Sequence, residues 1–186
     1  MGIKEAMLDT QSPKGKQFYT SMLRLLDSRG RKIFDNADKL VEAAGIIPGQ
    51  TVLEIGCGSG FFTVSAAKQV GGNGLLYSTD IHSIAIEETQ KKVEAHRLRN
   101  VIVQVDDALH SSFDSEVFDV ILLYGVVPAP VIPLEDIAME MHRLLKPGGI
   151  CAIWTKAPFW SPKATLQTAG FRVLEKRRGV FRYQKI

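Results

Sequence analysis

Short apolar runs alternate along the chain with longer segments whose apolar residues recur at helical spacing, a pattern typical of buried strands and amphipathic helices. It predicts strands at residues 51–55, 75–80, 100–105, 118–125 and 150–157, with helices at 61–70, 83–96, 135–145 and 162–169. Two last runs, 170–179 and 180–186, predict an antiparallel hairpin. This order predicts an α/β fold with a doubly wound, mostly parallel seven-stranded sheet, helices on both faces and an antiparallel C-terminal hairpin.

The N-terminal part of the chain shows helical patterns and no strand. One helix is predicted over 16–26 and a second over 32–44, and the apolar residues of the first are Phe18, Tyr19, Met22, Leu23, Leu25 and Leu26. Such an apolar face must be buried on the sheet edge, on a substrate or on a second subunit of a homo-oligomer, and we expect Phe18 to pack against the sheet. We therefore predict a helical lid or extension, 1–45, and a ligand-binding domain, 46–186.

Composition limits the classes to which the chain can belong. With 186 residues and 45% apolar content, one domain with a substantial core is expected. The formal net charge of +3 is too small to imply a field that attracts polyanions, which argues against nucleic acid as a partner. Cys57 and Cys151 have no metal-ligand spacing and favour a reducing cytoplasm. The absence of a signal peptide or membrane-length apolar run predicts a soluble protein.

The stretch VLEIGCGSG, residues 52–60, joins a buried strand to a turn with three alternate glycines. Gly56, Gly58 and Gly60 let a ligand touch the main chain, so the strand, turn and next helix predict a nucleotide-binding βαβ unit. The dinucleotide pattern G-x-G-x-x-G fails because position 61 or 63 is not glycine, and no Gly-Lys follows for a phosphate loop. Glu54, at the end of the strand, suits a cationic ligand rather than a pyrophosphate.

This E-x-G-x-G-x-G pattern and the later LLKPGG resemble the class I S-adenosylmethionine-dependent methyltransferases from about residue 38 to the C-terminus. The resemblance implies S-adenosylmethionine as cofactor and S-adenosylhomocysteine as product, bound at the carboxyl ends of the strands. Because Glu54, Asp80, Asp107 and Tyr124 all fall at such ends, we expect them to converge. The cofactor-binding residues implied are Glu54, Gly56, Cys57, Gly58, Gly60, Asp80, Ile81, Asp107, Ala108 and Tyr124.

Two carboxylates carry the expected adenosine contacts. Asp80 follows Gly60 by twenty residues and ends the next strand, where it could accept both ribose hydroxyls or merely cap the following helix. Ile81 would then lie against one face of the adenine. The family has an Asp-Ala pair after the third strand, whose carboxylate accepts from the adenine amino group, and the matching residues are Asp107 and Ala108.

The acceptor is expected over the ends of the first and fourth strands, near 124–128. Tyr124 could orient the acceptor, form a wall of the methionine site or only pack at the strand end, and Tyr19 could close over the site. No metal or covalent intermediate is needed, since the sulfonium methyl is already electrophilic. The histidines could act as a base. His82 and His110 follow predicted strand ends and could reach the rim of the site, His96 and His142 lie on predicted helices, and all four are expected at the surface.

Three functions remain open from the sequence. The first is methyl transfer to a small molecule, as in quinone biosynthesis, and the absence of Asn/Asp-Pro-Pro-Tyr/Phe after the fourth strand argues against base amines and glutamine amides. The second is methylation of RNA or protein, which the basic final hairpin could support, although such a cluster is more often a solvated face. The third is cofactor binding without turnover. Cys57 is interpreted as a packing residue, because the glycine loop needs a small side chain there. Two distant cysteines also argue against the arsenic methyltransferases, which resemble this fold but need several thiols.

Overall fold

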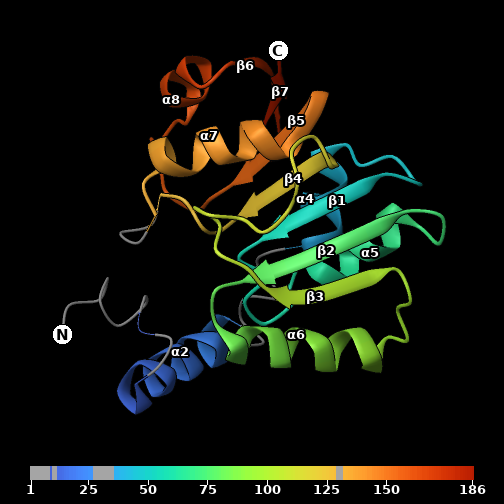
Figure 1. Ribbon diagram of the computed structural model, residues 1–186, viewed down its shortest axis with the longest axis vertical. Coiled ribbons are helices and arrows are strands. Elements are labelled where there is room, and N and C mark those ends of the chain that lie inside the picture. The colour runs from blue at the N-terminus through green and yellow to red at the C-terminus, as the bar shows by residue number, and fades with distance from the viewer. Residues whose placement is uncertain (1–8, 10–11, 27–35, 129–131) are drawn as a thin grey trace.

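The computed structural model describes residues 9, 12–26, 36–128 and 132–186. Their centre is a seven-stranded sheet with strand order β3-β2-β1-β4-β5-β7-β6 (Figure 1). Its strands from β3 to β5 are parallel, whereas β7 runs antiparallel to both β5 and β6. The predicted fold class is confirmed. The strand bounds are β1 (Thr51–Ile55), β2 (Leu75–Asp80), β3 (Val101–Val105), β4 (Phe118–Tyr124), β5 (Leu145–Trp154), β6 (Phe171–Arg177) and β7 (Val180–Lys185).

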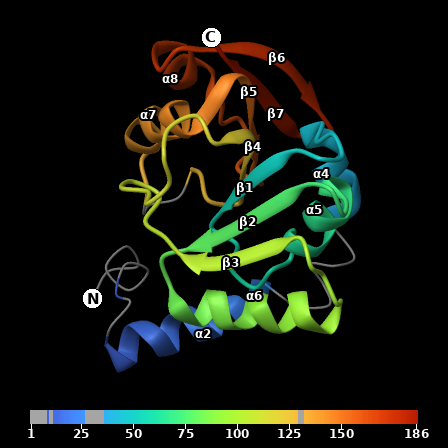
Figure 2. The same ribbon diagram turned by 45° about the vertical axis from the view of Figure 1, so that its right-hand side comes forward.

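Helices cover both faces of this sheet (Figure 2). Because successive side chains of a strand point to opposite faces, Val52 packs with α4 (Ala37–Ala44) and α5 (Thr63–Val70). Its neighbour Leu53 packs on the other face with α7 (Leu134–Leu144) and α8 (Lys163–Thr168). Two apolar cores therefore sandwich the sheet. None of the helices in the described part of the chain has the length and apolar content needed to cross a bilayer.

The N-terminal helix α2 (Pro13–Leu26) packs against α6 (Ser83–Ala95), as both views show. Its buried residues Tyr19 and Leu23 lie four positions apart and form a small cluster with Ala85, separate from the two main cores. The prediction that Phe18 is buried against the sheet is wrong, since its side chain is 37% exposed. The neighbouring residue on α2, Tyr19, faces inward instead.

Some element boundaries differ from the predictions. Asn36 caps α4 by accepting from Lys39 N, and residues 32–35 of the predicted helix lie outside the described residues. The helix after the glycine loop starts at Thr63 rather than at residue 61. The segment LKPGG, which lies between the predicted helix and the strand expected from residue 150, is extended, so β5 begins at Leu145 and pairs there with Phe118 before a shift in register.

Candidate functional site

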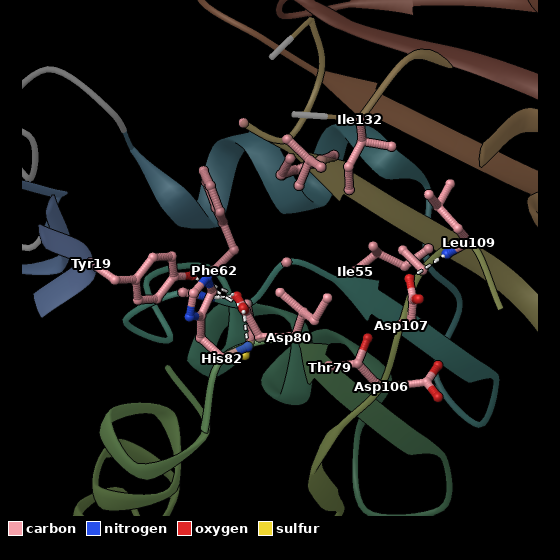
Figure 3. Close-up of a pocket in the computed structure, with 18 of the residues that line it drawn as sticks. Tyr19, Ile55, Phe62, Thr79, Asp80, His82, Asp106, Asp107, Leu109 and Ile132 are labelled. Carbon is pink, nitrogen blue, oxygen red and sulfur yellow. Dashed lines mark hydrogen bonds between the residues drawn. The ribbon is translucent and has the colours of Figure 1, made fainter. Parts of the chain in front are cut away.

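A cavity of about 450 Å³ opens at the carboxyl ends of the parallel strands. Its walls come from α2, the glycine loop, the end of β2, the loop after β3 and the segment between β4 and α7. Figure 3 shows side chains from these separate segments converging on one space. The size falls in the usual range for small-ligand sites. The charged residues that line it are Asp80, Asp106, Asp107 and Asp136, with no lysine or arginine among the described lining residues.

The glycine loop is tied to the neighbouring strand through its main chain. The amides of Gly56 and Cys57 both donate to the carbonyl oxygen of Thr79, at 2.8 and 2.9 Å. All three glycines have positive φ, which side chains rarely adopt. Gly58 and its neighbours line the cavity, whereas Gly60 does not and instead packs on Thr89. The loop therefore presents bare backbone to a ligand mainly at Gly58.

Glu54 does not line the cavity. It is 2% exposed, and its carboxylate accepts from Thr63 Oγ1 at 2.6 Å and from Ser78 Oγ at 2.7 Å. Burial raises the pKa of Glu54 to about 7, although the two hydroxyl hydrogen bonds act to lower it. The expected convergence with the other strand-end residues therefore fails for Glu54, which joins the start of α5 to β2 instead of facing a ligand.

Asp80 ends β2 and faces the cavity (Figure 3). Its carboxylate accepts from the amides of Gly58 and His82, each at 3.0 Å, and from the Tyr19 hydroxyl, which lies 3.1 Å from both oxygens. Burial raises its pKa, and these hydrogen bonds oppose the rise. Asp80 is not the cap of α6, because His82 holds that position without a side-chain capping bond.

The loop after β3 supplies a second carboxylate to the same cavity. Asp107 Oδ1 accepts from Leu109 N at 2.9 Å, while Asp106 is held by Ser111 Oγ and Ser112 N. The predicted residues Asp107 and Ala108 line the cavity together with Ile81, which is 37% exposed. The structure thus brings the predicted adenosine contacts to the lining of one cavity.

Tyr124 lines the cavity at the end of β4 but directs its hydroxyl away from it. That hydroxyl donates to the carbonyl oxygen of Leu40 at 2.9 Å, and the ring packs edge-on against Phe62. Burial raises the pKa of Tyr124. Cys57, also a lining residue, is buried with a raised pKa and lies 3.4 Å from Thr89 Oγ1, which donates to its sulfur.

Two lining residues outside the predicted cofactor-binding set also carry polar groups. Ser59, in the glycine loop, has a buried hydroxyl with no hydrogen-bond partner among the described residues. His82 was expected at the surface, but it is 2% exposed and stacks on the Tyr19 ring with centroids 3.6 Å apart. A position two residues beyond a strand end was its only sequence signal. His96 and His110 are exposed as predicted, and His142 is half-buried.

Comparison with known proteins identifies the family to which the chain belongs. A family model described as "Methyltransferase domain" matches residues 46–168. The chain belongs to this family. It is a class I S-adenosylmethionine-dependent methyltransferase domain, as the glycine loop and the sheet with its antiparallel hairpin agree.

Individual relatives match smaller parts. The aklanonic acid methyltransferase DauC of Streptomyces sp. (strain C5) is 32% identical over 62% of this chain and 47% of its own length. A demethylmenaquinone methyltransferase of Geobacillus stearothermophilus is 31% identical over 55% of this chain and 43% of its own. The matched region thus spans less than half of these relatives. The fold of an Aquifex aeolicus methyltransferase agrees with a TM-score of 0.76 at 22% identity, covering 89% and 98% of the two chains.

The methyltransferase domain has the groups that S-adenosylmethionine requires. The unpartnered Ser59 hydroxyl is a buried polar group that a ligand could satisfy. Gly58 lines the cavity with no side chain, and among the described residues a Cβ there would meet Leu23 Cδ2 alone, at 3.6 Å. Apart from His82, the groups in the described lining that carry charge are carboxylates, which suit a cofactor with a positive sulfur. The residues present therefore fit this cofactor.

Proposed function

We propose that this methyltransferase domain methylates a small, largely apolar molecule that carries no negative charge. The observation that carries the proposal is the composition of the cavity. Its charged lining consists of four aspartates, while most other lining side chains are apolar or aromatic, such as Met22, Phe61, Val126 and Ile132. An anionic acceptor would find no cationic side chain in the described lining and would be repelled by the carboxylates.

The cofactor would be held by residues of the β1–β3 side. Asp80 would accept from the ribose hydroxyls, Ile81 would cover an adenine face and Asp107 Oδ2 would accept from the adenine amino group. The Gly58 backbone and the Ser59 hydroxyl would contact the methionyl part. Each carboxylate is already oriented by main-chain amides, so little reorganisation is needed.

When bound, S-adenosylmethionine supplies a methyl group that its positive sulfur makes electrophilic. The chain then has to align the acceptor and exclude water. Tyr124 would serve as a wall, since its hydroxyl donates to Leu40, and in the cofactor-free protein the Tyr19 hydroxyl donates to Asp80. Burial raises the pKa of both phenols, which makes either one a poor base near neutral pH. We therefore assign neither of them a proton-transfer role.

The final hairpin gives less support to an RNA acceptor. Several of its basic groups already have acidic partners: Arg182 pairs with Glu175, Arg177 with Glu42 and Lys185 with Glu116. Paired guanidinium and ammonium groups offer less free charge to a phosphate backbone. A small neutral acceptor is the simpler match to the cavity.

A panel of acceptors tests the proposal. Formation of S-adenosylhomocysteine would be measured with neutral phenols and quinols, aromatic amines, aromatic carboxylic acids and unmodified tRNA. The carboxylic acids belong in the panel because one relative is named an aklanonic acid methyltransferase. Turnover of neutral or cationic aromatic compounds is expected. Turnover restricted to acids or to tRNA would contradict the proposed acceptor class, and no binding of S-adenosylhomocysteine would contradict cofactor use.

A further inference from the structure

The Tyr19 hydroxyl lies against the carboxylate that the proposed function assigns to the ribose. It comes from α2, sixty-one positions earlier in the chain, and lies 3.1 Å from both Asp80 oxygens. The Tyr19 ring is 6% exposed and stacks on His82 at an interplanar angle of 18°. Figure 3 shows the ring pointing from the N-terminal helix toward Asp80 and His82.

Counting acceptor positions shows why this contact matters. A carboxylate offers about four lone-pair sites, two on each oxygen. Gly58 N takes one site on Oδ2, and His82 N takes one on Oδ1. One site remains on each oxygen, and the Tyr19 hydroxyl lies between those two oxygens. Two adjacent ribose hydroxyls would need the same two sites.

Replacement of the Tyr19 hydroxyl by the ribose hydroxyls on Asp80 is favourable once the cofactor is present. Tyr19 has a single hydroxyl proton to share between two oxygens, whereas a ribose can donate one proton to each. Tyr19 cannot withdraw freely, because Leu23 and Tyr19 anchor the same helix face against Ala85 in a small cluster. Moving the Tyr19 hydroxyl away from Asp80 therefore strains or releases the packing of α2 on α6.

We propose that Tyr19 stands in for the ribose hydroxyls on Asp80, so that cofactor binding displaces it and loosens α2 from α6. The inference rests on the proposed function, since it takes Asp80 as the ribose acceptor. In the cofactor-free protein α2 is held against the site. Cofactor binding frees α2, so the part of the cavity that binds the acceptor can change shape only after the cofactor is bound. The energetic link is the competition for one carboxylate.

Tyr19→Phe tests the competition, because it removes the hydroxyl and keeps the ring on His82. S-adenosylhomocysteine binding would be measured by calorimetry for the wild type, for Tyr19→Phe and for the control Tyr77→Phe. Tyr77 packs among Phe113 and Phe118 and does not line the cavity. We expect Tyr19→Phe to bind about three- to tenfold more tightly, as loss of a competing hydrogen bond implies, and Tyr77→Phe to be unchanged. Weaker or equal binding by Tyr19→Phe would overturn the proposal.

Hydrogen exchange on the wild type provides a test that needs no variant. With S-adenosylhomocysteine added, the α2 amides (Pro13–Leu26) should exchange faster while the glycine loop becomes protected. Slower or unchanged exchange in α2, together with protection of the loop, would mean that the helix closes over the ligand or ignores it. Either result rejects the displacement of Tyr19 and leaves cofactor binding intact. No protection anywhere, with no calorimetric signal, would reject the proposed function itself.

Discussion

At the carboxyl ends of β1 and β2, the polar groups are fixed by main-chain hydrogen bonds, whereas the part of the cavity lining that comes from α2 and the β4–α7 segment presents mainly apolar side chains. Asp80 is oriented by two amides, and Thr79 O receives both Gly56 N and Cys57 N. That apolar part of the lining contributes Met22, Val126 and Ile132, whose contacts are not directional. The first wall can recognise one ligand in one orientation, and the second can accept a range of apolar shapes.

This difference separates two tasks within a single cavity. Fixed donors and acceptors suit a cofactor that is the same in every reaction of the family. Apolar contacts suit an acceptor that varies between relatives, because they tolerate changes of shape at small energetic cost. Changes to the fixed wall should therefore alter stability or cofactor affinity, and changes to the apolar wall should alter acceptor use.

The largest effect is expected from the pH dependence at Glu54. Its pKa lies near 4.5 in an unfolded chain and at about 7 in the folded protein, because burial disfavours the charged form. The associated stabilisation is complete below pH 4.5 and is lost as pH rises toward 7, by on the order of 3 kcal/mol. Glu54→Gln should remove this part of the pH dependence of the free energy of unfolding, measured by urea titration.

The variant Glu88→Gln provides a matched control for Glu54→Gln. Glu88 is an exposed glutamate paired with Lys91 on α6, so Glu88→Gln should leave the pH dependence as in the wild type. Some dependence should survive in Glu54→Gln, because burial also raises the pKa of Asp80. An unchanged pH profile in Glu54→Gln would show that the Glu54 charge is accommodated without cost.

The next largest effect concerns Asp80 and the cofactor. Asp80→Ala should weaken S-adenosylhomocysteine binding by about 1.5–3 kcal/mol, the range for hydrogen bonds to a charged group, which is roughly ten- to 150-fold in calorimetry. The exposed Asp114, outside the cavity, provides the control Asp114→Ala. A fall in melting temperature with no change in affinity would instead give Asp80 a purely structural role.

The fixed wall could be predicted from sequence, because its residues sit at strand ends that short local patterns identify. Asp80, Asp107 and Ala108 reach the cavity as their positions after β2 and β3 imply. Glu54 has the same kind of position, but its side chain turns to the α5 face. Strand alternation places Glu54 on the same face as Val52, which packs with α4 and α5, so this difference could have been read from the sequence.

The apolar wall was harder to predict, because long-range packing decides it. Phe18 and Tyr19 are neighbours on an apolar helix face, and sequence periodicity does not say which one turns inward. The position of α6 decides which of the two residues is buried, because Ala85 packs against Tyr19 and Leu23. The burial of His82 follows from the same contact, because the Tyr19 ring covers it. Such tertiary contacts leave no local signal in the sequence.

A smaller effect is expected at the glycine loop. Gly58 has φ +55°, and a Cβ there would meet only Leu23 Cδ2, so Gly58→Ala should lower the free energy of unfolding by about 1 kcal/mol through backbone strain. Its cofactor affinity should also fall, because Gly58 lines the cavity and its amide orients Asp80. Gly56→Ala is the contrast: its Cβ would lie 2.6 Å from Val126 Cγ2, so its main effect should be on stability. Unchanged affinity in Gly58→Ala would mean that the ligand does not approach that residue.

The smallest effect on the fold is expected from removing the N-terminal segment. Deleting residues 1–30 takes away α2 and its small cluster with Ala85, but none of the strands and neither main core. The free energy of unfolding should fall by about 1 kcal/mol or less, a shift of a few degrees in melting temperature. Cofactor binding should persist, while methylation of an identified acceptor should drop because one wall of the cavity is missing. Full-rate methylation by the truncated protein would show that α2 does not contribute to the acceptor site. Failure to fold would make α2 part of the core and assign acceptor choice to residues 124–133.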